Sequence, residues 1–206
     1  MPGMLGWFKM TSETSLEDIE WMLAKSAGYD GGYALVADQE SIAQNGNLDV
    51  ILDKVGDWEK LRLANVFTEK QKSDMRDNNK EFTLQRIDGN SWSWQAVHAH
   101  IFTHQKKVSQ PGEPLYSTFD FQNPGSEQPI QFVFSSQKAG LSEISLEINN
   151  YKKIALPLVL EKGQRLQYSG GEELWVLNAE WNLIKSVKVC PVDFKLKTGE
   201  NSLNIY

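Results

Sequence analysis

The first part of the chain alternates short apolar runs with one amphipathic segment. Residues 5–10 and 33–37 are apolar runs of strand length. Between them, apolar side chains recur at helical spacing, at Leu16, Ile19, Met22 and Leu23. Ser15 stands at the N-cap position with Asp18 three residues later, which predicts a capping box. The pattern predicts a strand–helix–strand unit whose two strands pair in parallel through a right-handed crossover.

A second amphipathic helix is predicted from residue 48 to about residue 67. Apolar residues at helical spacing define its buried face, namely Leu48, Ile51, Leu52, Val55, Trp58, Leu61 and Val66. Residues 70–80 are almost entirely polar, so they are either the solvated end of this helix or a linker. We therefore expect a domain boundary there.

From residue 81 onward the apolar period changes to two, which is typical of half-buried strands. A turn at residues 88–90 separates the predicted strands 82–87 and 91–103, and a loop is predicted at 106–114. Further short strands are predicted at 115–121, 130–135, 144–148, 153–156, 165–168, 174–177, 186–189, 194–196 and 202–206. Many short strands separated by turn residues predict an antiparallel β-sandwich of jelly-roll or related topology.

The expected fold class is therefore α+β, with a βαβα segment over residues 1–75 and a predominantly antiparallel β-sandwich over 81–206. The apolar load of the first segment predicts that it packs on the second. Cys190 lies in an apolar stretch beside Pro191 and is expected to be buried.

Composition narrows the classes of partner. The formal net charge of −6 argues against nucleic acid, and no apolar run approaches the ~18 residues that would span a membrane. The first residues lack the basic and apolar regions of a signal peptide, which leaves the location open. The seven tryptophans suit either a core or a flat ligand such as a sugar.

Two stretches resemble a known family. The sequences LGWFKM and TSLEDIEWMLAKSAGYDGGYAL resemble the closing part of the catalytic barrel in large bacterial glycoside-hydrolase-like proteins. The later run IALPLVLEKGQRLQYSGGEELWVLNAEWNLIKSV is similar to the β-sandwich module that follows such barrels. The resemblance implies a C-terminal fragment of a protein that acts on polysaccharides or glycoconjugates, in the periplasm or outside the cell. Its partners would be carbohydrate and the rest of the catalytic domain.

The chain departs from this family in lacking most of the barrel, so no catalytic carboxylate pair carries over and the chain alone is not expected to be catalytic. Asp38 and Glu40 follow the second predicted strand, at the end where α/β barrels hold their active sites. They are candidate catalytic residues, or else ordinary loop acids that cap the next turn. Glu17, Asp18 and Glu20 are expected only to favour the helix dipole.

The predicted strand 91–103 carries the main binding candidates. Alternation puts Trp92, Trp94, His98 and His100 on one face, together with Ala96, Phe102 and His104. Such a face could stack and hydrogen-bond a sugar, or it could pack as core with the histidines at a domain interface. The histidines could also bind a metal, but no carboxylate or cysteine joins them at ligand spacing, so we predict no metal and no cofactor.

Trp181, between Glu180 and Asn182, is predicted to be an exposed aromatic residue in a polar turn and hence a further sugar platform. The alternative to an accessory module of a glycoside hydrolase is a non-catalytic carbohydrate-binding or structural protein.

Overall fold

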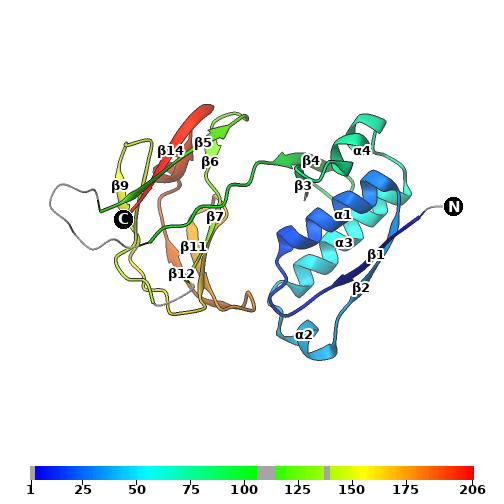
Figure 1. The fold of residues 1–206 in the computed structure, drawn as a ribbon, viewed down its shortest axis with the longest axis horizontal. Helices are drawn as coiled ribbons and strands as arrows, with labels where there is room; N and C mark the ends of the chain where they lie inside the picture. Colours follow the sequence, from blue (N-terminus) through cyan, green and yellow to red (C-terminus); the bar gives the residue numbers. More distant parts are fainter. Residues whose placement is uncertain (1–2, 106–114, 137–139) are drawn as a thin grey trace. The chain divides into compact units, whose positions relative to one another are not determined.

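The computed structural model describes residues 3–105, 115–136 and 140–206. The predicted loop at 106–114 lies outside the described residues. The chain is α+β, as predicted, and it divides into two compact units (Figure 1). Unit 1 runs to Ala99 and includes Glu180–Asn182, whereas unit 2 contains His100–Ala179 and Leu183–Tyr206. The jelly-roll-like topology, the barrel origin and the packing of one part on the other stay predictions.

Unit 1 contains four helices and four strands in its described residues. In chain order they are β1 (Met4–Lys9), α1 (Leu16–Tyr29), β2 (Gly32–Val36), α2 (Gln39–Gln44), α3 (Leu48–Leu63), α4 (Glu69–Arg76), β3 (Glu81–Arg86) and β4 (Trp92–Val97). Strands β1 and β2 pair in parallel, and β3 and β4 pair in antiparallel. The parallel pairing of the strand–helix–strand unit is therefore confirmed.

The start of α1 also follows the sequence prediction. The Asp18 backbone N–H donates to the Ser15 Oγ at 3.1 Å, and the Ser15 backbone N–H donates to the Asp18 carboxylate at 3.3 Å. These two bonds form the predicted capping box and satisfy N–H groups that the first helical turn leaves free. The helix ends one residue beyond Gly28, where Asp30 takes the left-handed conformation.

One hydrophobic cluster holds unit 1 together. Its fully buried members include Ile19 and Leu23 of α1, Ile51 and Trp58 of α3, and Met75 of α4. Leu52, which was expected on the buried face of α3, is instead 56% exposed. One residue along a helix turns the side chain by 100°, so Ile51 and Leu52 cannot both face the same narrow contact.

The expected domain boundary at residues 70–80 differs from the structure, because the β3–β4 hairpin belongs to unit 1. Phe82 and Leu84 of β3 are buried in the same cluster as α1 and α3. Most of the polar stretch is helix α4 rather than a linker. Its Met75 is fully buried, and the Lys25 ammonium donates to the backbone carbonyls of Met75 and Asp77 at 2.9 and 2.6 Å.

Unit 2 contains two four-stranded antiparallel sheets. One sheet has the order β12-β11-β10-β7, the other has the order β5-β14-β8-β9, and β13 pairs with β6. The elements are β5 (Ser117–Asn123), β6 (Gln128–Pro129), β7 (Phe132–Ser135), β8 (Ser145–Ile148), β9 (Lys153–Ala155), β10 (Arg165–Tyr168), β11 (Glu173–Leu177), β12 (Leu183–Lys188), the 3₁₀ helix η1 (Pro191–Phe194), β13 (Lys195–Leu196) and β14 (Gly199–Ile205).

Both sheets of unit 2 contribute to one hydrophobic cluster. Leu146 and Leu203 come from one sheet, Leu166 and Leu174 come from the other, and all four are almost fully buried. Cys190 is exposed, so the prediction of a buried thiol is wrong. It precedes η1, which places Phe194 rather than Cys190 in the core.

A hydrogen bond between Tyr206, the residue after β14, and Glu147 of the neighbouring strand β8 makes the stability of unit 2 depend on pH. The Tyr206 hydroxyl donates to the Glu147 Oε2 at 2.6 Å. This bond lowers the pKa of Glu147 from 4.5 and raises the pKa of Tyr206 to about 12. The folded state thus holds the Glu147 proton more weakly, and the Tyr206 proton more tightly, than the unfolded state does.

We expect two pH windows from these shifts. The free energy of unfolding should fall as the pH drops through the acidic range below 4.5, and again as it rises from about 10 to about 12. Tyr206→Phe should remove the Tyr206 part of the alkaline loss and reduce the acidic loss, as measured by denaturant midpoints across pH. Tyr151→Phe, at a residue that is 80% exposed, is the control and should keep both windows. An alkaline profile unchanged by Tyr206→Phe would contradict the assignment.

Candidate functional site

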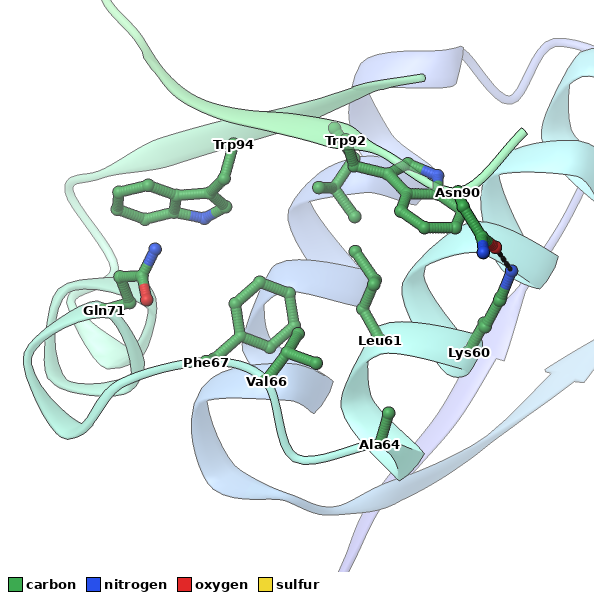
Figure 2. A pocket seen from close by; sticks show the side chains of 10 residues that line it. Lys60, Leu61, Ala64, Val66, Phe67, Gln71, Asn90, Trp92 and Trp94 are labelled. Carbon is green, nitrogen blue, oxygen red and sulfur yellow. Dashed lines mark hydrogen bonds between the residues drawn. The ribbon is translucent and has the colours of Figure 1, made fainter. Parts of the chain in front are cut away.

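Unit 1 holds a pocket of about 400 Å³ between α3, the start of α4 and the β3–β4 hairpin (Figure 2). Its lining is largely apolar and aromatic, with three polar side chains. The lining residues are Lys60, Leu61, Ala64, Val66, Phe67, Gln71, Leu84, Asn90, Trp92 and Trp94. A concave apolar site with a few polar groups is the usual form of a small-molecule site.

Strand β4 brings two of the predicted binding residues into this pocket. Trp92 and Trp94 are two residues apart on a strand, so their side chains lie on the same face, as predicted. The antiparallel register pairs Trp92 with Arg86 and Trp94 with Leu84. The Trp94 ring stacks on Phe82, with the ring centres 4.6 Å apart and the planes at 13°. Both tryptophans are partly exposed, so their rings border the pocket while packing on the core.

Polar groups lie at the two ends of the aromatic wall that Trp92 and Trp94 form. The Lys60 ammonium lies 4.5 Å from the centre of the Trp92 ring and donates to the Asn90 Oδ1 at 3.3 Å. The Gln71 Oε1 accepts from the backbone N–H and hydroxyl of Thr68, in the capping box of α4. Figure 2 shows Lys60 and Asn90 beside Trp92, and the Gln71 amide on the side of Trp94. The capping bonds hold Gln71 in place at the mouth of the pocket.

The indole N–H groups of Trp92 and Trp94 are both buried, and no protein group of the described residues accepts a hydrogen bond from them. An unpaired buried donor destabilises the fold by about 1–3 kcal/mol, and native proteins contain few of them. Here two of them occur in adjacent side chains that line the same pocket.

Trp181 does not lie at an exposed platform, and the prediction that it is exposed is wrong. It is 6% exposed, and its indole N–H donates to the Glu13 carbonyl at 2.8 Å. Its own carbonyl lies so close to Gly46 that any side chain there would clash, since a Cβ on Gly46 would come within 2.5 Å. Trp181 therefore serves as a buried structural residue of unit 1.

The predicted histidine face does not form, because β4 ends at Val97 and residues 98–105 are not a strand. His98 belongs to unit 1 and is exposed, whereas His100 belongs to unit 2. The His100 ring stacks on Phe102 at 6.0 Å and packs against Phe121 at 5.6 Å. The His104 Nδ1 shares a hydrogen bond with the Ser117 hydroxyl. None of these histidines lines the pocket.

The two candidate acids take ordinary roles at α2. Asp38 is the N-cap of this helix, where its carboxylate accepts from the Ser41 backbone N–H at 2.7 Å. This bond and that from the Ser41 hydroxyl lower the pKa of Asp38. Glu40 is exposed in the first turn and accepts from the Gln44 side chain at 3.0 Å. Neither acid lines the pocket.

Over the part of the chain that the structure describes, no group of three His, Cys, Asp or Glu side chains could hold a metal ion. Within the same residues, no helix combines the length and the apolar character that crossing a membrane requires.

Sequence reasoning found the two tryptophans of the pocket but missed its polar residues. Asn90 ends the turn before β4, and Lys60 is an exposed residue of α3 that precedes the partly buried Leu61. The turn is a local signal that places Asn90 close to Trp92. The approach of Lys60 to Trp92 joins residues 32 positions apart, so no local pattern reveals it.

No family model matches the chain, and no curated protein or solved structure matches it either.

Proposed function

We propose that the chain is a carbohydrate-binding accessory part of a carbohydrate-active protein, and that the pocket of unit 1 holds one sugar ring. The observation that carries this proposal is the wall of Trp92 and Trp94, flanked by the side chains of Lys60, Asn90 and Gln71. Sugar rings present C–H faces that pack on indole rings, while their hydroxyls need polar partners at the edge. The pocket offers both kinds of contact.

The lining favours binding over cleavage. Glycoside hydrolysis generally uses a pair of carboxylates placed about the scissile bond. None of the ten lining residues, all of them within the described part of the chain, carries a carboxylate. The same pocket would serve the alternative, a non-catalytic carbohydrate-binding protein that belongs to no hydrolase.

The exposed apolar side chains of the parallel pair β1–β2 support an origin of unit 1 in a (β/α) barrel. Parallel strands normally have both faces of their sheet covered. The parallel pair β1–β2 leaves Leu5, Trp7 and Val36 at 43%, 80% and 40% exposure. In a barrel these side chains would be covered by further strands and by one another. Unit 2, with two sheets on one core, would be the jelly-roll-like module that follows.

The proposal is tested by titrating plant, host and microbial oligosaccharides into the full chain by calorimetry. We expect weak binding to at least one glycan. Trp92→Ala and Trp94→Ala should each weaken it about three- to tenfold, the equivalent of about 0.5–1.5 kcal/mol for one aromatic contact. Trp94 also stacks on the buried Phe82, so thermal melting must show that each variant is folded.

Trp175→Ala is the matched control, because Trp175 is 42% exposed on β11 and belongs to unit 2. It should bind as the wild type does. Binding that survives both pocket substitutions, or that is lost only with Trp175→Ala, would move the site elsewhere. A chain that binds no glycan would contradict the proposed function.

A further inference from the structure

The pocket contains a cation that the chain does not neutralise. The Lys60 ammonium has two close partners, the face of the Trp92 ring and the Asn90 amide oxygen, and neither carries a charge. Among the ion pairs of the described residues, none involves Lys60. The charge therefore remains available to a ligand that lies against Trp92.

The neighbouring carboxylates are engaged elsewhere. Asp57, one helical turn before Lys60 on α3, pairs with Arg86. Glu59 pairs with Arg62 at 2.7 Å. The Asp88 carboxylate, in the turn before β4, accepts from the Asn90 backbone N–H at 2.9 Å. Asp57 and Glu59 therefore have cations of their own, whereas Asp88 is bonded to a neutral N–H group, and no ion pair of the described residues joins any of the three to Lys60.

We propose that the pocket selects acidic sugars, with the ring of a uronic acid against Trp92 and its carboxylate at the Lys60 ammonium. This inference rests on the proposed function, since it names the class of sugar for the same site. A uronic acid differs from its neutral parent only at C6, where a carboxylate replaces a hydroxymethyl group. The ring contact with the indole is therefore the same for both, and the carboxylate adds the interaction with Lys60.

The net charge of the chain sharpens this inference. With a net charge of −6, the chain as a whole repels an anionic ligand. The net charge alone would therefore make the acidic sugar bind more weakly than the neutral one. A preference for the acidic sugar must then come from a local cation. The contribution of one exposed ion pair corresponds to a two- to fivefold gain in affinity, and salt should reduce it.

The experiment compares oligomers of galacturonate and glucuronate with their carboxyl-reduced, neutral forms, by calorimetry on the full chain. We expect the acidic form to bind about two- to fivefold more tightly at low salt. Lys60→Met should abolish this preference, so that the acidic and neutral forms bind with the same affinity, and Lys60→Arg should keep the preference. Lys70→Met, at an exposed residue of α4 outside the pocket, is the control and should change neither.

The outcomes separate the two proposals. Equal binding of both forms, lost in Trp92→Ala, would leave the sugar site standing and overturn the selectivity for acids. A preference for the acidic form that persists in Lys60→Met would also overturn it, because the charge would then lie elsewhere. Failure of both forms and of every other glycan to bind would contradict the sugar site itself, and the selectivity with it.

Discussion

Replacing Glu20 by alanine is expected to lower the free energy of unfolding by about 3–5 kcal/mol. Glu20 is 7% exposed, although it is a charged residue of α1. Its Oε1 accepts from the Trp58 indole N–H at 3.2 Å and from the Leu84 backbone N–H at 3.0 Å, and it pairs with the Lys54 ammonium at 3.0 Å. Alanine would leave two buried donors without an acceptor and would remove the carboxylate that pairs with Lys54, whose ammonium keeps only neutral acceptors such as the Leu84 carbonyl. Removing one partner of a buried pair is the costly way to break it.

Two further variants test the origin of this loss. Glu20→Gln keeps an acceptor of the same shape but removes the charge, so it should cost less than alanine does. Glu17→Ala changes an exposed acid in the first turn of the same helix and should cost at most about 1 kcal/mol through the helix dipole. Urea denaturation measures the loss in the free energy of unfolding for each of the three variants, as a shift of the midpoint at an unchanged slope of the transition. Equal losses for Glu17→Ala and Glu20→Ala would mean that burial plays no part.

The burial of Glu20 also shows where sequence reasoning ends. Glu17 and Asp18 lie in the first turn of α1 and Glu20 follows in the next, and the sequence predicts the same helix-dipole role for all three. Asp18 forms the predicted capping box because its partner, Ser15, is three residues away. The partners of Glu20 come from α3 and β3, 34 to 64 residues further along the chain. Hydrogen bonds between residues a few positions apart can be predicted from their spacing in the sequence, whereas contacts between distant parts of the chain cannot.

The same division applies to the candidate site. Period-two alternation predicted that Trp92 and Trp94 share a face, and they do line one pocket. Alternation could not predict where β4 ends, so it wrongly extended that face to His98 and His100. Trp181 looks like a surface residue because Glu180 and Asn182 flank it, but its hydrogen-bond partner is Glu13, 168 residues away. Polar neighbours in the sequence therefore did not predict exposure.

Leu23 and Leu52 provide a direct test of the helical packing. Both were expected to be core residues, but only Leu23 is buried. Leu23 of α1 is 1% exposed, whereas Leu52 of α3 is 56% exposed. Leu23→Ala should lower the free energy of unfolding by about 2–5 kcal/mol, since it removes buried methyl groups and leaves a cavity in the cluster. Leu52→Ala should change it by no more than about 0.5 kcal/mol, because alanine suits a helix and little buried area is lost.

The pair is well matched, since the substitution is the same and both sites lie inside helices of unit 1. Chemical denaturation of the full chain, followed by tryptophan fluorescence, measures both values. If Leu52→Ala cost as much as Leu23→Ala, the side of α3 that carries Leu52 would have to be covered in solution. If neither substitution mattered, the cluster that joins α1, α3 and α4 would not be the core of unit 1. A large loss in the free energy of unfolding for Leu23→Ala alone would show that the face of α1 that carries Leu23 is buried. Glu20 contacts Trp58 from this same face.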